Sequence, residues 1–183
     1  MKRLVLTSAL AVALLAVIAA TAAVAHNDNG RNKAKLDGYQ EVPAAISTTG
    51  RGSFRARVTS EGIRYTLRYQ DLETNALFAH IHFGQQHVAA TGNIIAFLCG
   101  GGDKPACPAL GGTVEGVIDA ADIIGPAAQG IEAGSLAEAV RALRKGAVYV
   151  NVHSTRFPAG EIRGQVGGNN GNGNGKKRDR DDD

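Results

Sequence analysis

Residues 149–165, YVNVHSTRFPAGEIRGQ, predict two β-strands joined by a turn at FPAG. Valines occupy every second position from 148 to 152, and alternate side chains of a strand point to opposite faces of its sheet. Each strand therefore has an apolar face and a polar face. The two polar faces carry Tyr149, Asn151, His153, Glu161, Arg163 and Gln165.

Residues 79–83, AHIHF, show the same alternation. The apolar positions 79, 81 and 83 point to the core in this interpretation, and His80 and His82 project together from the opposite face. If this strand lies in one sheet with the strand that contains His153, the three imidazoles share a surface. This expected cluster is the main functional feature of the sequence.

Other short strands surround these two stretches. Residues 52–58 and 63–69 predict a hairpin, and residues 93–98 and 113–118 predict two more strands. Short strands separated by glycine-rich turns predict a mainly β fold, either an antiparallel β-sandwich or a barrel. One short α-helix interrupts the pattern, because Ser135 and Glu138 form a capping box and Gly146 supplies a stop.

The expected hairpin carries exposed arginines at positions 55, 57, 64 and 68. These residues can form a basic stripe, but acidic residues at 61, 71 and 73 are close in the sequence. We therefore interpret the stripe as an ordinary solvated sheet face.

The chain begins with the charged, apolar and small-residue segments of a secretory signal peptide, residues 1–25. An uncleaved anchor is the alternative, since the apolar run approaches the roughly 20 residues that span a bilayer. After the signal we expect a flexible lead at 26–34, one domain at 35–166, and a disordered Gly/Asn-rich and charged tail at 167–183.

Signal cleavage changes the charge balance. It removes Lys2 and Arg3 from the 20 basic residues and leaves 18 against 17 acidic ones, a net charge of +1. A nearly neutral chain favours no nucleic-acid partner. We expect a secreted or periplasmic protein, without a membrane span after cleavage, whose partner is an extracytoplasmic protein or surface ligand.

Two cysteines, Cys99 and Cys107, flank a short loop that contains glycine and proline. In an exported protein this pair predicts a disulfide. A thiolate metal site is the alternative, and it requires a reducing compartment that the expected signal peptide argues against.

The sequence resembles the CHRD domain family, first described as a repeat in chordin and also found as a stand-alone exported bacterial domain. The resemblance rests on LDG at 36–38 with EVP at 41–43, AHIHFG at 79–84, YVNVH at 149–153 and GEIRGQ at 160–165. It implies an immunoglobulin-like or superoxide-dismutase-like sandwich and no established catalytic activity. In chordin, the domains belong to an extracellular antagonist of growth factors.

Two functions remain open at this point. In the first, the protein is a binding or structural module, and the histidines fix strand register through hydrogen bonds. In the second, His80, His82 and His153 hold Zn²⁺ or copper for storage or redox chemistry, and no catalytic residues are assigned. The pair at 80 and 82 is similar to the His-x-His strand that binds copper in Cu/Zn superoxide dismutases. Candidate supporting or binding residues are Asn151, Glu161, Arg163 and His87.

Overall fold

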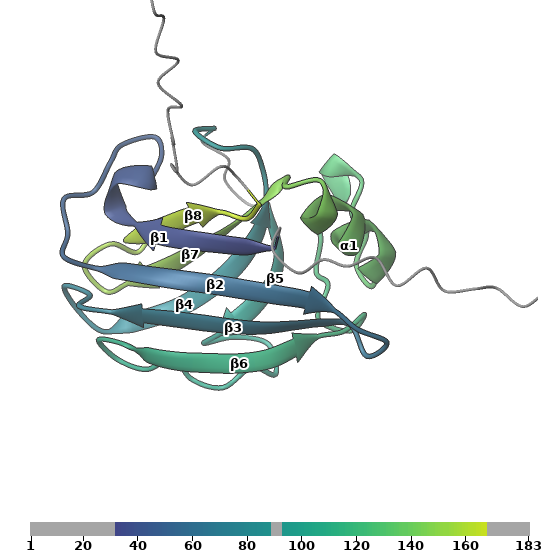
Figure 1. The fold of residues 1–183 in the computed structure, drawn as a ribbon, viewed down its shortest axis with the longest axis horizontal. Coiled ribbons are helices and arrows are strands. Elements are labelled where there is room, and N and C mark those ends of the chain that lie inside the picture. The colour runs from purple at the N-terminus through teal and green to yellow at the C-terminus, as the bar shows by residue number, and fades with distance from the viewer. Residues whose placement is uncertain (1–31, 89–92, 168–183) are drawn as a thin grey trace, which may run out of the picture.

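The computed structural model describes residues 32–88 and 93–167 (Figure 1). The expected signal peptide, most of the expected lead and nearly all of the expected tail lie outside these residues. In chain order the elements are β1 (Lys33–Asp37), η1 (Gly38–Gln40), β2 (Arg51–Val58), β3 (Ile63–Gln70), β4 (Ala76–Phe83), β5 (Ile94–Cys99), β6 (Gly112–Ile118), η2 (Ala127–Gln129), α1 (Leu136–Arg144), β7 (Val148–Ser154) and β8 (Ile162–Gln165).

The eight strands form one antiparallel sheet in the order β5-β4-β7-β8-β1-β2-β3-β6. The sheet curls until it is nearly a barrel, and its two end strands, β5 and β6, contact each other (Figure 1). Across the interior, the Tyr65 hydroxyl of β3 donates a hydrogen bond of 2.7 Å to the Leu98 carbonyl of β5. The expectation of a mainly β, antiparallel fold with one α-helix is therefore confirmed for the described residues.

The core lies inside the curl and follows the period of two. Phe54, Leu67, Val150 and Ile162 are each completely buried, and they come from β2, β3, β7 and β8. Burying one such side chain stabilises a fold by about 1.5–3 kcal/mol. The predicted hairpins β2–β3 and β7–β8 both form, because alternation fixes which face of each strand enters this core.

The helix forms where it was expected, but its N-terminal cap differs. Ser135 is the N-cap residue, yet its side chain makes no capping hydrogen bond. The Glu138 carboxylate binds Arg141 Nη1 at 2.7 Å, so it does not complete the predicted capping box. The helix is held by its buried side, Ala139, Ala142 and Leu143. Within residues 32–88 and 93–167, no helix has both the length and the apolar character needed to cross a bilayer.

Cys99 and Cys107 form the predicted disulfide, which closes a loop after β5. Both sulfur atoms are used in this bond, so the alternative of a thiolate metal site is wrong. We expect the Cys99→Ser/Cys107→Ser double variant to lose about 2–3 kcal/mol of unfolding free energy, the entropy of closing a loop of this size in the unfolded chain. Urea unfolding of the disulfide-bonded wild type and of the variant, both without reductant, measures the difference, and equal midpoints would contradict the prediction.

Candidate metal centre

The polar face of β4, β7 and β8 is buried, although strand alternation alone left it free to face solvent. His80, His82 and His153 have exposed fractions of 3%, 6% and 7%. Loop residues reach this face from several directions: the Pro158 carbonyl contacts His153, and Asn93 contacts His82. The domain therefore has an apolar core on one side of these strands and a covered polar layer on the other.

Strand pairing explains why the three histidines meet. In the register between β4 and β7, Phe78 lies opposite His153 and His80 lies opposite Asn151, which makes His80 and His153 diagonal neighbours. Long side chains reach across such a diagonal. His82 follows two residues later on the same face. One nitrogen from each ring belongs to a group of potential ligand atoms that all lie within 4.8 Å of one another, and His80 Nδ1 is 3.2 Å from His153 Nε2.

Hydrogen-bond partners define the tautomer of each ring. The Asn93 amide nitrogen donates to the Phe83 carbonyl, which turns the Asn93 oxygen toward His82 Nδ1 at 3.1 Å. His82 Nδ1 therefore carries the proton. His153 Nδ1 likewise donates to the Pro158 carbonyl at 3.0 Å, because a carbonyl only accepts.

These assignments leave Nε2 of His82 and His153 as lone-pair donors. His153 Nε2 accepts from His80 Nδ1, so His80 Nε2 also carries a lone pair. The Nε2 atoms of His80 and His82 are buried and have no hydrogen-bond partner among the described residues. An unsatisfied buried polar atom costs about 1–3 kcal/mol, so a group that binds both atoms stabilises the fold.

Burial keeps all three rings neutral. Desolvation, helped by the neighbouring imidazoles, lowers the pKa of His80 to about 3. Desolvation likewise lowers the pKa of His82 to about 3, although its bond to Asn93 acts in the opposite direction. The pKa of His153 is also lowered by burial. Neutral imidazole is the form that binds metal, so no proton has to leave at neutral pH.

Aromatic side chains hold the histidine rings in place. The His82 ring stacks on Tyr149 with centroids 4.7 Å apart and an angle of 2° between the planes. His80 lies between Phe78 and Phe97, whose ring centroids are 4.9 and 4.5 Å away. Packing on both sides restricts rotation of these imidazoles, and it makes the immediate surroundings apolar.

A second polar group lies beside the histidines. Arg163 places its guanidinium carbon 3.6 Å from the Tyr149 ring centroid and donates to the Gln85 and Val88 carbonyls. Asn151 donates to Glu41 Oε2 at 3.3 Å. Desolvation raises the pKa of Glu41 to about 7, although Arg163 and the Asn151 bond act in the opposite direction.

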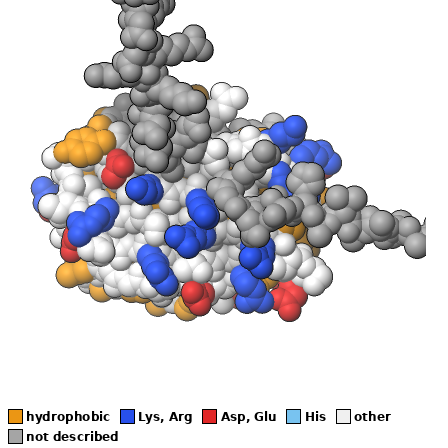
Figure 2. Space-filling model, viewed as in Figure 1, with side chains coloured by type: hydrophobic (Ala, Val, Ile, Leu, Met, Phe, Trp, Pro, Cys, Tyr) orange, Lys and Arg blue, Asp and Glu red, His pale blue; other side chains and the backbone are white. Residues whose placement is uncertain are grey.

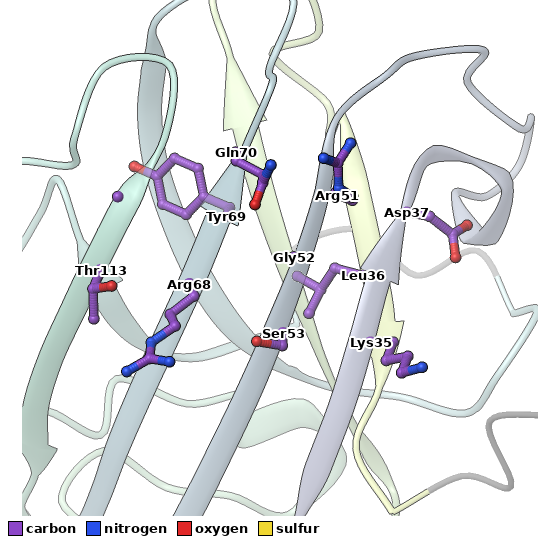
Figure 3. A pocket seen from close by; sticks show the side chains of 11 residues that line it. Lys35, Leu36, Asp37, Arg51, Gly52, Ser53, Arg68, Tyr69, Gln70 and Thr113 are labelled. Atoms are coloured by element: carbon purple, nitrogen blue, oxygen red, sulfur yellow. The ribbon is translucent and has the colours of Figure 1, made fainter.

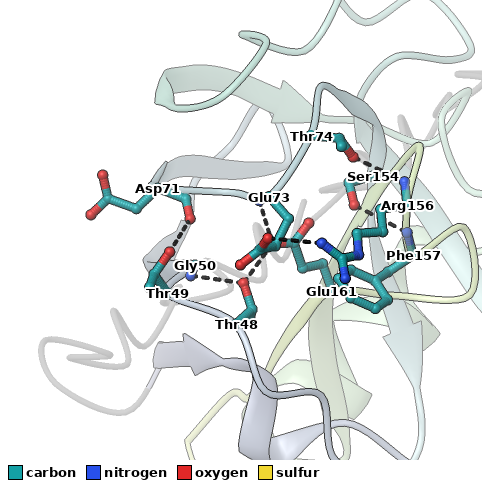
Figure 4. A network of polar contacts seen from close by, with 10 residues as sticks. All are labelled: Thr48, Thr49, Gly50, Asp71, Glu73, Thr74, Ser154, Arg156, Phe157 and Glu161. Atoms are coloured by element: carbon teal, nitrogen blue, oxygen red, sulfur yellow. Dashed lines mark hydrogen bonds and ion pairs between the residues drawn. The ribbon is translucent and has the colours of Figure 1, made fainter.

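Glu161 belongs to a different network, shown in Figure 4. Its Oε1 accepts from the Thr48 hydroxyl at 2.7 Å and from the Glu73 backbone N–H at 2.8 Å. His87 is exposed at the surface, and neither it nor Glu161 belongs to the three-histidine group. The structure thus brings His80, His82 and His153 together, places Asn151 and Arg163 next to them, and puts Glu161 and His87 elsewhere.

Sequence reasoning missed the roles of Asn93, Tyr149 and Glu41. The strand pattern predicts the face of Tyr149 but carries no sign that its ring stacks on His82. The sequence indicates Asn93 only as the start of a strand. Glu41 belongs to the EVP motif, which was the one available signal that this position matters.

Gly160 closes the polar layer. Its φ is +139°, and a Cβ there would lie 2.6 Å from Asn151 Nδ2 and 2.8 Å from Glu41 Oε2. We expect Gly160→Ala to lower the unfolding free energy by roughly 2–4 kcal/mol, from the unfavourable backbone and the displaced side chains. Gly130→Ala is the matched control: φ is +88° there and no atom lies within 4 Å of the added Cβ. Equal losses in thermal unfolding would show that the contacts with Asn151 and Glu41 contribute nothing.

Comparisons with known proteins agree with the resemblance seen in the sequence. The family model of the CHRD domain matches residues 33–166, from the first residue of β1 to the residue after β8. No curated protein and no solved structure gives a significant match. The match covers most of the chain and includes all eight strands, the helix and the three histidines. The chain belongs to the CHRD domain family.

Proposed function

We propose that this CHRD protein binds one Zn²⁺ or copper ion through His80, His82 and His153. The observation that carries the proposal is the pair of buried Nε2 atoms on His80 and His82 that lack a partner among the described residues, next to a third neutral imidazole. Buried polar atoms normally have partners, and one ion bound to both nitrogens supplies them.

The donor set favours Zn²⁺ or copper over other ions. Imidazole suits Zn²⁺ and copper, whereas Ca²⁺ and Mg²⁺ prefer oxygen ligands. Three protein ligands leave one position open, which is the arrangement of reactive rather than purely structural zinc sites. With copper, the same position is available for redox chemistry. Asn93 and the Pro158 carbonyl orient two of the rings through their Nδ1 atoms, as outer partners of metal ligands usually do.

The alternative is a binding or structural module in which the histidines serve only the fold. The His80–His153 hydrogen bond favours it, because this side-chain bond joins β4 to β7 without any ion. We further propose that the protein acts outside the cytoplasm, since its disulfide suits an oxidising compartment. We also propose that its curled sheet is a sandwich of the immunoglobulin-like or superoxide-dismutase-like kind.

Metal stoichiometry separates the two functions. Purified full-length protein is dialysed against Zn²⁺ or Cu²⁺, and the bound metal is counted by mass spectrometry. We expect one ion per chain in the wild type and in His87→Ala, which removes an exposed histidine outside the cluster. His82→Ala should retain less than a tenth of that amount. Equal metal in all three proteins, or none in the wild type, rejects the metal site and leaves the module.

A further inference from the structure

The outward face of β1, β2, β3 and β6 is strongly basic. Strand alternation places exposed cations there, as Figure 2 shows over the same strands as Figure 1. We call this surface the basic face, and its cations are Lys33, Lys35, Arg51, Arg55, Arg57, Arg64 and Arg68. The acidic residues on the same face of these strands are Asp37 and Glu115.

This concentration does not follow from the overall charge. The described residues contain 13 lysines and arginines and 12 acidic residues, which is nearly neutral. Seven of those 13 cations lie on the basic face, but only two of the 12 acids do. Positive charge is therefore concentrated on one face, although the net charge of the described residues is close to zero.

Of the acids that lie close in the sequence, Glu61 and Asp71 pair with cations of the basic face. Ion pairs join Arg64 to Glu61 (2.7 Å), Arg51 to Asp71 (2.8 Å) and Arg156 to Glu73 (3.1 Å). The first two pairs lie at opposite ends of β3, and the third involves an arginine from another part of the fold. Glu115 on β6 hydrogen-bonds Thr66 rather than a cation.

The strand register places like charges directly opposite each other. Lys33 of β1 faces Arg55 of β2, and Arg57 of β2 faces Arg64 of β3. Like-charged pairs in this position destabilise a sheet. A bound anion would offset the repulsion within these pairs.

A groove crosses the middle of the basic face (Figure 3). Its volume is about 730 Å³, and its lining includes Lys35, Arg51, Ser53, Arg68 and Thr113. The register aligns Lys35, Ser53, Arg68 and Thr113 in one row across four strands. Ser53 is a small residue between Lys35 and Arg68. The Cα atoms of these two cations are about 10 Å apart, because neighbouring strands are spaced ~4.8 Å.

We propose that the basic face binds a linear acidic polysaccharide that carries carboxylate or sulfate groups. Arginine and lysine form strong charge-assisted hydrogen bonds with such anions. The hydroxyl group of Ser53 lies between Lys35 and Arg68, and those of Thr66 and Thr113 lie next to Arg55 and Arg68, where sugar hydroxyls would meet them. Separated cations along a groove suit a chain with regularly spaced charges.

Other polyanions fit this surface less well. Single-stranded nucleic acids are held by aromatic stacking, and among the described residues Phe54, Tyr65 and Tyr69 of these strands are all buried inside the sheet. Membrane surfaces hold proteins that also insert apolar side chains. The exposed large hydrophobic side chains of the described residues are Tyr39, Leu77, Val88, Leu110 and Ile124, none of them in β1, β2, β3 or β6.

The test uses the full-length protein with dextran sulfate and polygalacturonate as probes, and neutral dextran as the blank. A face variant, Lys35→Gln/Arg55→Gln/Arg68→Gln, is compared with a helix variant, Arg141→Gln/Arg144→Gln/Lys145→Gln. Both lose three positive charges, so net charge is matched. Circular dichroism and melting temperature establish that each is folded, and Arg68→Gln against Arg141→Gln repeats the comparison if a triple variant does not fold.

We expect titration calorimetry at low salt to show roughly 10- to 100-fold weaker binding of the charged polysaccharides by the face variant, with a salt dependence shallower by about 2–3 in log–log slope. The helix variant should bind as the wild type does. Equal weakening in both variants, or none in either, overturns the proposal. Tighter binding to phosphatidylglycerol vesicles or single-stranded DNA than to either polysaccharide overturns it in favour of that ligand. The proposal is independent of the metal centre, because none of these substitutions touches a histidine.

Discussion

Zn²⁺ is expected to raise the melting temperature of the metal-free protein by roughly 12 °C or more. A ligand that binds only the folded state at 1,000 times its dissociation constant contributes about 4 kcal/mol. In a domain of this size each kcal/mol shifts the melting temperature by roughly 3–5 °C. The ion also satisfies the buried Nε2 atoms of His80 and His82, which have no partner among the described residues.

Two histidine variants show where the ion binds. His80→Ala should melt at the same temperature with and without Zn²⁺, because two histidines on separate strands hold the ion much more weakly than three. His87→Ala should show the full shift, since this residue is exposed and outside the cluster. A shift of the same size in His80→Ala would place the ion elsewhere on the protein.

Mild acid is expected to destabilise the metal-free protein. The folded-state pKa of His80 and His82 is lowered to about 3, so these rings stay neutral when folded but take up protons when unfolded, near pH 6.5. Their stabilisation is therefore complete above pH 6.5 and is lost as pH falls toward 3. Each loses up to ~1.4 kcal/mol per pH unit in this range.

Glu41 acts in the opposite direction. Its folded-state pKa is raised to about 7, so the folded protein holds an extra proton between that pH and 4.5, and this contribution grows as pH falls. The histidines outnumber it, and the net loss of unfolding free energy between pH 7.5 and pH 4.5 should be about 1–4 kcal/mol.

Urea unfolding across this pH range measures the sum of the histidine and Glu41 contributions to the unfolding free energy. His82→Gln should flatten the pH profile, and Glu41→Gln should make it steeper, because the two variants remove opposing contributions. A wild-type profile that is flat or rises toward acid would show that the histidines are not buried as the structure has them. The same profile measured in saturating Zn²⁺ should begin to fall only where protons displace the ion.

The strands and the cluster were predictable because their causes are local. Alternation at residues 79–83 and 148–153 fixes the face on which each histidine projects, and only the pairing of β4 with β7 had to be assumed. The cover over that face was not predictable. It comes from loops such as those of Asn93 and Pro158, which lie 11 and 5 residues from the histidines they contact but have no periodic pattern of their own.

Two other features of the structure could not be predicted from the sequence, and each has a physical reason. Alternation is the same in a sandwich and in a closed barrel, because both bury every second residue, so the sequence predicted the strands but not the single curled sheet. At the helix start, Ser135 and Glu138 have the spacing of a capping box, but Arg141 competes for the carboxylate from the next turn. A sequence motif does not show which other side chains compete for the same group.

The most direct test of the metal centre is anomalous X-ray diffraction from crystals of the protein loaded with one equivalent of Zn²⁺ or Cu²⁺, recorded at the absorption edge of the metal. A three-histidine site predicts one strong peak about 2.0–2.1 Å from one ring nitrogen of each of His80, His82 and His153. A peak bound to other residues, or none with the three rings still in their present positions, would contradict it.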